Sequence, residues 1–161
     1  MLAIASDSAL CVLEFHRGER LTRLERRLAR WFPPHTFADE PNAVIEQTSA
    51  WLRGYFDGRA ANAAAVPLEM RGAEFERRVW KALLDIPAGE TRSYGDIARR
   101  LGDPGASRAV GMANGANPIA IIVPCHRVIG ANGSLTGYGG GLDKKTWLLD
   151  HERRWRKGRL F

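Results

Sequence analysis

The chain has 161 residues, of which 45% are hydrophobic and 26% are charged, so it is long enough for one mid-sized globular domain or two small ones. Two cysteines, Cys11 and Cys125, exclude a disulfide framework and a cysteine-rich zinc site. Residues 1–71 carry nine basic and nine acidic residues, so the whole net charge of +6 lies in residues 72–161. This asymmetry favours a polyanionic partner for the second half, with solvated surface charge as the alternative.

The first half of the chain has the pattern of a small sheet with helices. Short strands are predicted at residues 1–5 and 10–15, on either side of a turn. Apolar residues at helical spacing predict a helix over residues 19–32, which stops at a Pro-Pro pair, and a second over residues 44–58. The apolar stripe of the second helix, whose Trp and Tyr residues are predicted to be core, contains Val44, Ile45, Thr48, Trp51, Leu52, Tyr55 and Phe56.

An alanine-rich segment, residues 59–65, has no periodic pattern and is the predicted crossover between the two halves. We therefore expect an N-terminal structural domain over residues 1–71 and a second domain over residues 72–161. Residues 66–70 alternate between apolar and other residues, which predicts a further strand.

The second half begins with one helix and continues with a pair of short helices. Apolar positions predict a helix over residues 75–86 that ends at a proline. Ser93 is the predicted N-cap of the next helix, residues 94–101, with Asp96 as its capping-box partner. A Gly-Asp-Pro-Gly turn breaks that helix, and another follows over residues 106–113. This pattern is typical of a helix-turn-helix and also of a plain helical hairpin.

Arg108 is the one long cationic side chain on the last of these helices, and most of the other side chains on that helix are small. Its small residues are Ala106, Ser107, Ala109, Gly111 and Ala113. Small side chains let the backbone of a helix approach a partner closely. This feature favours the nucleic-acid interpretation of the helix pair.

The most informative stretch surrounds the second cysteine. An apolar run over residues 119–123 precedes Pro124, Cys125, His126 and Arg127, and a glycine-rich segment follows. A short apolar run bounded by prolines predicts a buried segment. Pro124 fixes one backbone angle and so helps to aim the thiol, and the basic neighbours favour its nucleophilic thiolate form. For a Cys-His pair alone, a buried structural cysteine is the alternative.

The end of the chain predicts one more helix and a basic tail. Asp143 is the predicted N-cap of a helix that runs to Arg154. The predicted inner face of this helix contains Trp147, Leu148 and His151. Residues 153–161 include five basic residues and a tryptophan, and both phosphate binding and disorder explain such a tail.

The second half resembles the O6-alkylguanine-DNA alkyltransferases in the order and spacing of its motifs. The central match is Pro124-Cys125-His126-Arg127, with Asn117-Pro118 before it and Tyr-Gly-Gly-Gly-Leu at residues 138–142 after it. Further matches are Phe75, Val79-Trp80, Ile86-Pro87, Gly89-Glu90-Thr91, Ser93-Tyr94, Ser107-Arg108-Ala109-Val110-Gly111, Trp147-Leu148-Leu149 and His151-Glu152. The resemblance covers residues 72–152, about half of the chain.

The resemblance implies an α+β fold. Residues 1–71 would form a small sheet-and-helix domain with a ribonuclease-H-like fold and a mainly structural role. Residues 72–161 would form a mostly helical domain with a winged-helix-like helix-turn-helix. The implied activity is DNA repair by irreversible, single-turnover transfer of an alkyl group to Cys125, after the damaged base has been flipped out of the duplex. O6-alkylguanine is the implied substrate, and O4-alkylthymine is a further candidate.

The resemblance also implies a role for each catalytic residue. Cys125 is the alkyl acceptor, His126 is its base through a bound water, and Glu152 orients the imidazole. Asn117 orders the turn that holds the cysteine, and the hydroxyl of Tyr94 donates towards a ring nitrogen of the flipped guanine. Without the resemblance, Glu152, Asn117 and Tyr94 are ordinary helix-end, turn and helix residues.

Double-stranded DNA is the implied partner, bound through its minor groove. Arg108 would take the place of the base that is turned out of the stack. Ser93, Ser107, Ala109 and Gly111 would form the DNA-binding surface around it. The protein is expected to be a monomer in solution, with cooperativity on DNA left open.

The implied substrate pocket is formed by Pro124, Val128, Tyr138, Gly139 and Gly140. Two residues depart from the pattern of the family. Gly139 stands where many relatives have Ser or Ala, and Ala120 stands where some have Pro. Both departures predict a wider pocket rim that accepts bulkier adducts or O4-alkylthymine.

No metal, cofactor or membrane segment is expected. Cys11, His16 and His35 are too few and too oddly spaced for the zinc site that some members of the resembled family carry. The glycine-rich segment lacks the Gly-Lys-Ser/Thr ending of a P-loop. The chain shows no signal peptide or membrane span, and a working thiol needs a reducing compartment, so we expect the cytoplasm.

Two other functions stay open at this stage. A binding-only relative would recognise alkylated bases without transfer, but known proteins of that kind carry Trp in place of the cysteine. A cysteine hydrolase would need a spatially separate histidine and an oxyanion hole, and nothing beyond the adjacent Cys125 and His126 supports it.

Overall fold

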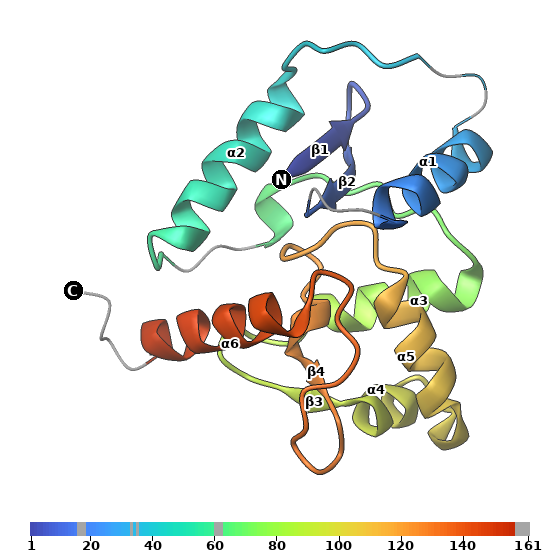
Figure 1. Cartoon of the computed structure of the whole chain (residues 1–161), viewed down its shortest axis with the longest axis vertical. Helices are drawn as coiled ribbons and strands as arrows, with labels where there is room; N and C mark the ends of the chain where they lie inside the picture. Colours follow the sequence, from blue (N-terminus) through green and yellow to red (C-terminus); the bar gives the residue numbers. More distant parts are fainter. Residues whose placement is uncertain (16–18, 33, 35, 60–62, 157–161) are drawn as a thin grey trace.

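The computed structural model describes residues 1–15, 19–32, 34, 36–59 and 63–156. The fold begins with an antiparallel ribbon of two strands, β1 (Leu2–Ala5) and β2 (Leu10–Glu14), in which Leu2 pairs with Glu14 (Figure 1). Every residue of β2 is buried, because further chain covers both of its faces. The two predicted strands are confirmed.

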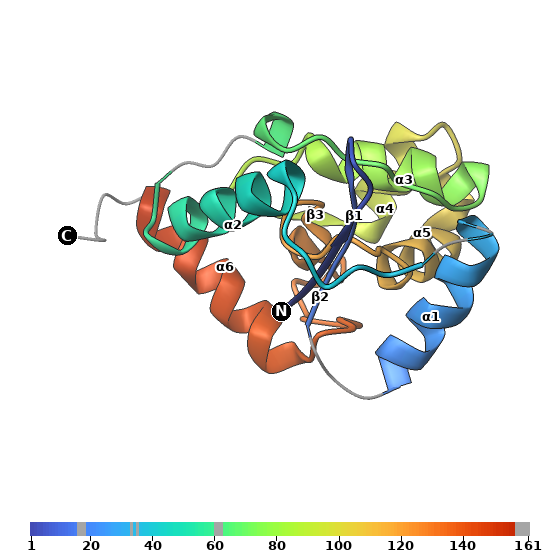
Figure 2. The ribbon, with the colours of Figure 1, turned by 90° about the horizontal axis from the view of Figure 1, so that it is seen from above.

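Two helices flank this ribbon on opposite sides (Figure 2). In α1 (Glu19–Trp31), the apolar residues Leu24, Leu28 and Trp31 pack with Cys11 and Val12 of β2. This face has the spacing expected of an amphipathic helix, so the first predicted helix is confirmed.

The second flanking helix, α2 (Ala43–Phe56), begins at Asn42, whose side-chain oxygen accepts a hydrogen bond from the backbone N of Ile45 at 3.0 Å. Trp51 and Tyr55 are buried, as expected of core residues. Phe56, the last residue of α2 and of the apolar stripe, is 41% exposed, and its ring packs against the rings of Trp147 and His151.

Residues 66–70 do not form the predicted strand. They make one isolated parallel bridge, between Leu10 and Leu68, in which the N of Leu10 donates to the O of Pro67 at 2.8 Å. Pro67 has no N–H, so it cannot extend a ladder. The 3-10 turn η1 (Ala63–Ala65) precedes the bridge, and residues 60–62 of the expected crossover lie outside the described residues.

The second half is mostly helical. Its longer helices are α3 (Glu74–Leu84), α4 (Tyr94–Arg100), α5 (Ser107–Gly115) and α6 (Leu142–Arg156), and its 3-10 turns are η2 (Pro104–Ala106) and η3 (Cys125–Arg127). Two short strands that the sequence does not predict, β3 (Arg92–Ser93) and β4 (Val128–Ile129), pair in parallel. Within the described residues, no helix has the length and apolar character of a membrane span.

The predicted helix pair is present as α4 and α5. The hydroxyl of Ser93 accepts from the N of Asp96 at 3.1 Å, and the carboxylate of Asp96 accepts from the N of Ser93 at 2.8 Å, so the capping box is confirmed. α5 ends two residues later than predicted, at Gly115. The indole N–H of Trp80, on α3, donates to the carbonyl of Ala113 at 2.8 Å, which anchors the end of α5.

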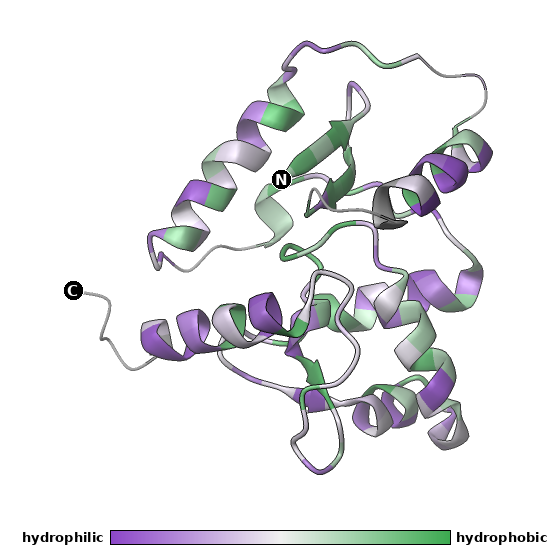
Figure 3. Ribbon diagram, in the orientation of Figure 1, coloured by the Kyte–Doolittle hydropathy of each residue, from purple (hydrophilic) through white to green (hydrophobic). Residues whose placement is uncertain are grey.

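One continuous hydrophobic core draws on both halves of the chain, from Leu13 of β2 to Val79 of α3. Residues 119–123 cross its middle and are all buried, as predicted. The N of Leu13 donates to the O of Pro118 at 2.9 Å, so the segment before the cysteine is joined to β2. In Figure 3 the hydrophobic colour gathers on the ribbon and on this segment between the two halves.

Helix α6 differs from its prediction at two points. It begins at Leu142, so Asp143 lies inside the first turn and is not the N-cap. Trp147 is 52% exposed rather than on the inner face, because the inward positions follow a different helical row. The buried residues of α6 are Lys145, Leu148, Leu149, His151 and Glu152, which confirms the predicted positions of Leu148 and His151.

Candidate active site

Cys125 lies at the start of a short turn that its neighbours hold at both ends. Pro124 leads into η3 with φ −83°, and the N of Cys125 donates to the O of Val123 at 2.8 Å. The carbonyl of Cys125 accepts from the N of Val128 and from Nδ2 of Asn114, the latter at 3.2 Å. Cys125 is 6% exposed, so the cysteine sits at the edge of the core in a fixed backbone.

The side chain of Asn117 lies inside the turn that leads to the cysteine. Its Nδ2 donates to the O of Val123 at 2.8 Å, and its Oδ1 accepts from the N of Ile119 at 3.0 Å. Between them, Ile121 has φ +70°, a conformation that costs a β-branched residue about 1–3 kcal/mol. The side chain of Asn117 thus bonds the backbone on both sides of Ile121.

Glu152 is completely buried and is the centre of a hydrogen-bond network. Its Oε1 accepts from Nε2 of His126, from the hydroxyl of Tyr55 and from Nη2 of Arg127, each at 2.8 Å. Its Oε2 accepts from Nε of Arg127 at 2.9 Å and from the N of Gly89 at 3.0 Å. The guanidinium therefore compensates the carboxylate inside the core through two nitrogens.

This network fixes the charge state of the histidine. Burial raises the pKa of Glu152, but hydrogen bonds from His126 and Arg127 outweigh it and hold that pKa well below its ordinary value. Burial lowers the pKa of His126; the bond to Glu152 opposes this shift, and the charges of Arg127 and Lys145 add to it. His126 is therefore neutral at pH 7, with its proton on Nε2. Among the described residues its basic nitrogen, Nδ1, has no hydrogen-bond partner.

A buried lysine, Lys145, belongs to the same site. Its Nζ donates to the carbonyls of Val128 and Thr136, both at 2.7 Å. Burial lowers the pKa of Lys145, and attraction to Cys125 raises it. That attraction is mutual, so the ammonium favours the thiolate of Cys125. No sequence signal marks Lys145, because a lysine in the first turns of a helix is usually exposed.

Tyr94, at the start of α4, contacts the same loop. Its hydroxyl donates to the carbonyl of Thr136 at 3.1 Å, so Tyr94 and Lys145 share one acceptor. Burial raises the pKa of Tyr94, the bond to Thr136 opposes that rise, and the nearby charge of Cys125 adds to it. The hydroxyl therefore keeps its proton at pH 7 and is available as a donor.

The predicted DNA-binding residues gather on α4 and α5. Ser93 caps α4, Ser107 begins α5, and Arg108 and Ala109 on α5 are exposed. A Cβ added at Gly111 would lie 3.8 Å from the ring of Tyr94, so this face of α5 approaches a predicted catalytic residue. The two predicted groups of residues are therefore neighbours.

The predicted pocket residues differ in exposure. Pro124 and Val128 are buried, Tyr138 and Gly140 are half-buried, and Gly139 is exposed. A Cβ at Gly140 would come within 2.7 Å of the Tyr138 ring and 2.8 Å of the Phe15 ring, so only glycine fits there.

Ala120 does not lie at a pocket rim. It is 3% exposed, within the core, and its N donates to the O of Leu13 at 2.7 Å. Proline at this position would lack that N–H, so alanine preserves a tie between the cysteine segment and β2. The prediction of a wider rim now rests on Gly139 alone.

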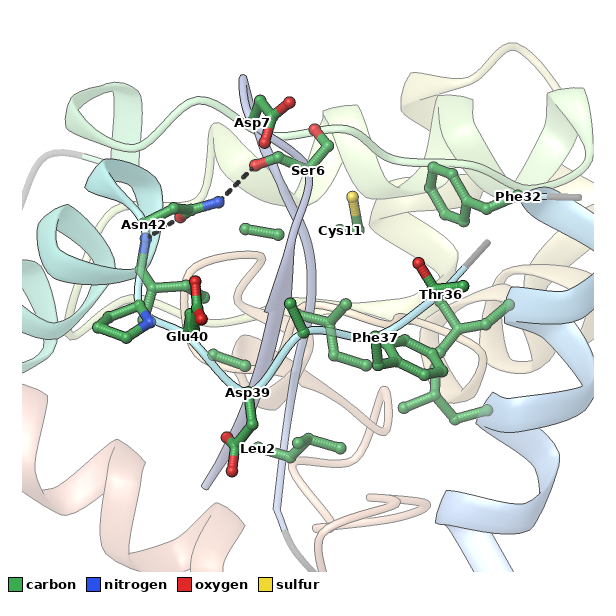
Figure 4. A pocket seen from close by; sticks show the side chains of 18 of the residues that line it. Leu2, Ser6, Asp7, Cys11, Phe32, Thr36, Phe37, Asp39, Glu40 and Asn42 are labelled. Carbon is green, nitrogen blue, oxygen red and sulfur yellow. Dashed lines mark hydrogen bonds between the residues drawn. The ribbon is translucent and has the colours of Figure 1, made fainter. Parts of the chain in front are cut away.

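Two cavities lie away from Cys125. One of about 910 Å³ lies in the N-terminal half between β1, α1 and residues 36–42, with Cys11 at its border (Figure 4). Another of about 620 Å³ lies beside Ile121 and Arg127, behind the cysteine turn. Cys125 lines neither of these two cavities.

In the described part of the chain, no group of three or more His, Cys, Asp or Glu side chains is arranged to hold a metal ion. His16 and His35 lie outside that part, so the expected absence of a zinc site stays a prediction.

The sequence does not reveal two of the partners of Glu152. Tyr55 is predicted only as a core residue, and it comes from 97 positions away. Arg127 is predicted to act on the thiol, whereas its guanidinium bonds Glu152 and the carbonyl of Ile86. The only available signal was an arginine next to His126, with an acid in a later helix.

Comparison with known proteins places these features in a family. Residues 74–154 match the model of the DNA-binding domain of 6-O-methylguanine DNA methyltransferase. Over 145 residues the chain is 60% identical to a methylated-DNA–protein-cysteine methyltransferase of Mycolicibacterium paratuberculosis, a match that covers 86% of this chain and 83% of that protein. A protein of the same name from Methanosarcina mazei is 58% identical over 113 residues, 70% of this chain and 71% of its own length.

A solved structure agrees over nearly the whole chain. The crystal structure of Mycobacterium tuberculosis OGT in complex with DNA matches with a TM-score of 0.80 at 46% identity, covering 95% of this chain and 86% of that one. The mixed fold of helices and small sheets is thus the one seen in OGT structures, which confirms the α+β class at this level. The chain belongs to the methylated-DNA–protein-cysteine methyltransferase family.

Proposed function

We propose that Cys125 is the alkyl acceptor with which this chain, a methylated-DNA–protein-cysteine methyltransferase, repairs alkylated DNA. The observation that carries the assignment is the position of Cys125, in a turn held at both ends, next to a neutral His126 that Glu152 orients. The other cysteine, Cys11, lies instead beside the carboxylate of Glu69, with its sulfur 3.7 Å from Oε2. A carboxylate disfavours the thiolate that such a transfer needs.

The proposed reaction is a direct displacement. The sulfur of Cys125 forms a bond to the alkyl carbon while the bond from that carbon to O6 of guanine breaks, and the electrons of the broken bond stay on the base. The thiol proton passes to Nδ1 of His126 through water, and Glu152 stabilises the imidazolium that results. Lys145 stabilises the thiolate before the attack. The product is a thioether, so each protein molecule reacts once.

The departing guanine needs a donor for its developing charge. Tyr94 supplies it when its hydroxyl exchanges the carbonyl of Thr136 for a ring nitrogen of the flipped base. Overall, the thiol gives up one proton and the departing guanine takes up one proton in place of the alkyl group, so atoms and charges balance. The carbonyl of Val128 and the segment at residues 138–141 border the base.

The α4–α5 pair is the proposed minor-groove reader, with Arg108 in the place of the flipped base. The support is the exposure of Arg108, the small residues beside it and the approach of α5 to Tyr94. The excess positive charge of residues 72–161 adds attraction to phosphates that does not depend on sequence.

Finer expectations belong to the same proposal and rest on the sequence. They are a ribonuclease-H-like domain at residues 1–71, a winged-helix-like helix-turn-helix within residues 72–161, a monomer in solution and a place in the cytoplasm. O4-alkylthymine is kept as a second substrate because Gly139 offers no side chain at the pocket rim.

The fate of the alkyl group tests the proposal. Duplex DNA that carries O6-methylguanine with a labelled methyl group is mixed with the protein, and the label is then followed in protein, DNA and solvent. We expect one methyl group per protein molecule, retained after denaturation, and no second round of reaction. Cys125→Ala is expected to take up no label and still to bind the DNA, because affinity comes mostly from phosphate and groove contacts.

Three outcomes would overturn the assignment. Label released to solvent as methanol would indicate a hydrolase, and label left on DNA that the protein binds would indicate a binding-only relative. Uptake by Cys125→Ala would show that another residue is the acceptor.

A further inference from the structure

The first half of the chain reaches the C-terminal end of α5 directly. Nη1 of Arg27, on α1, donates to the carbonyl oxygen of Ala116, the residue that follows the last turn of α5. The two residues are 89 positions apart in the sequence. Figures 1 and 2 both show α1 beside the end of α5. The helix that carries Arg108 is thus tied to a residue far outside the DNA-binding segment.

The guanidinium of Arg27 is held in place by three further side chains. Its central carbon lies 4.3 Å from the ring centre of Trp31 and 5.9 Å from that of Trp80. Its Nη2 is 3.8 Å from Oε1 of Glu76, whose Oε2 accepts from the N of Ala73 at 2.9 Å. These contacts fix the orientation of the flat guanidinium, so that its bond to the end of α5 needs little further ordering. A lysine side chain is more flexible and lacks the flat group that stacks on tryptophan.

The C-terminal end of α5 attracts such a cation. The last carbonyls of a helix lack partners within the helix and carry partial negative charge. Here Trp80 bonds the carbonyl of Ala113 at 2.8 Å, and Arg27 bonds that of Ala116. The Ala116 carbonyl belongs to the peptide bond that leads into Asn117. Arg27 therefore holds the point at which α5 passes into the cysteine turn.

We propose that Arg27 is a positioning residue for repair in duplex DNA. With Trp31, Glu76 and Trp80 it forms what we term the α5 clamp, which sets the angle at which α5 presents Arg108. This inference rests on the proposed role of α5 at the minor groove, and it gives the N-terminal half a part in reading DNA. The cysteine turn has its own bonds from Asn117 and Asn114, so the clamp affects the duplex reaction more than the chemistry at Cys125.

The test compares two substrates in matched variants. Arg27→Met keeps the apolar stem and removes the charge and the donors. We expect its rate of methyl transfer from O6-methylguanine in duplex DNA to fall about tenfold, as for the loss of a charge-assisted hydrogen bond, and its rate with free O6-benzylguanine to stay within about twofold. Arg30→Met, at an exposed position of the same helix, removes the same charge and is expected to leave both rates unchanged.

Arg27→Lys serves as the second variant, because it keeps a cation and loses the flat stacking group. We expect a duplex rate about threefold below that of the native chain, with the free-base rate unchanged. Equal losses on the two substrates, in either Arg27 variant, would overturn the proposal, because they would indicate a general structural role. Equal effects of Arg27→Met and Arg30→Met would also overturn it, since charge alone would explain them. Failure of the native chain to react with free O6-benzylguanine would instead contradict the assignment of Cys125.

Discussion

The two cysteines of this chain are buried to nearly the same extent, at 4% exposure for Cys11 and 6% for Cys125. The charged groups near them, however, have opposite signs. Cys11 lies on β2 at the register shift next to the turn of the β1–β2 ribbon, and its sulfur is 3.6 Å from the carbonyl of Ala9 and 3.7 Å from the carboxylate of Glu69. Burial raises the pKa of Cys11, and the charge of Glu69 adds to the rise. This cysteine therefore stays a thiol at the border of a cavity with mixed polar and apolar lining (Figure 4).

Cys125 has a cation and a base where Cys11 has a carboxylate. Lys145 attracts its thiolate, and His126 presents a basic nitrogen that Glu152 orients. Exposure therefore does not distinguish Cys125, the proposed alkyl acceptor, from Cys11. The sign of the nearest buried charge and the presence of an oriented base distinguish the two sites.

The largest effect is expected when the charge of Glu152 is removed. Glu152→Gln leaves the guanidinium of Arg127 buried without its anion, which typically costs about 3–5 kcal/mol. At this chain length that corresponds to a melting temperature lower by roughly 6–20 °C, with methyl transfer lost. Glu69→Gln, beside Cys11, is the matched control and should lower the melting temperature by about 4 °C or less, since its pair with Arg71 is partly exposed. Equal drops in the two thermal melts would contradict the account.

The next effect separates the cysteine site from the DNA-reading surface. Arg108→Ala should slow repair in duplex DNA on the order of 100-fold, because base flipping costs a few kcal/mol that the arginine helps to offset. The rate with free O6-benzylguanine should hardly change, since a free base needs no flipping. Arg77→Ala, an exposed position on α3, controls for the lost charge. Equal losses on both substrates would show that Arg108 serves the pocket or the fold.

A smaller effect is expected from the reaction itself. A methyl group on Cys125 enters a packed turn, and overpacking costs about 1–3 kcal/mol, so the melting temperature should fall by roughly 2–12 °C. A methyl group placed on Cys11 should cost less, because a cavity of about 910 Å³ borders that residue. The measurement is a thermal melt of the reacted protein after the DNA has been removed. A raised or unchanged melting temperature would refute the tight packing of the reacting sulfur.

The smallest expected effect concerns pH. Burial lowers the pKa of His126, so the folded protein keeps this base neutral below the ordinary value near pH 6.5. The rate with free O6-benzylguanine should be constant from about pH 6.5 to 8. In the unfolded chain the imidazole of His126 binds a proton near pH 6.5, whereas in the folded chain it stays neutral at that pH. The contribution of His126 to stability is therefore fully present above that pH and is lost as the pH falls below it. An acid limb of the rate above pH 7 would contradict a neutral, buried His126.

Local signals account for the features that the sequence predicts correctly. The capping box of Ser93 and Asp96 and the buried apolar run at residues 119–123 each depend on residues close together in the chain. Family resemblance supplied Glu152, whose charge is an ordinary feature of a helix end in the sequence.

Tertiary contacts decide the features that the sequence does not predict. Lys145 is buried because two distant carbonyls receive its ammonium group. Trp147 lies outside because the inward row of α6 begins at Lys145 and ends at Glu152. The strand expected at residues 66–70 is limited to one bridge because Pro67 lacks a donor. None of these follows from hydrophobic periodicity alone.

Our main proposal is that charge and an oriented base, rather than exposure, select Cys125 over Cys11 as the alkyl acceptor. Its most direct test is to locate the transferred group by mass spectrometry of peptides, after reaction with duplex DNA that carries O6-methylguanine. The account predicts that the peptide with Cys125 gains one methyl group, that the peptide with Cys11 gains none, and that Cys11→Ser changes neither the yield nor the rate. A methyl group on Cys11, or one divided between the two cysteines, would contradict it.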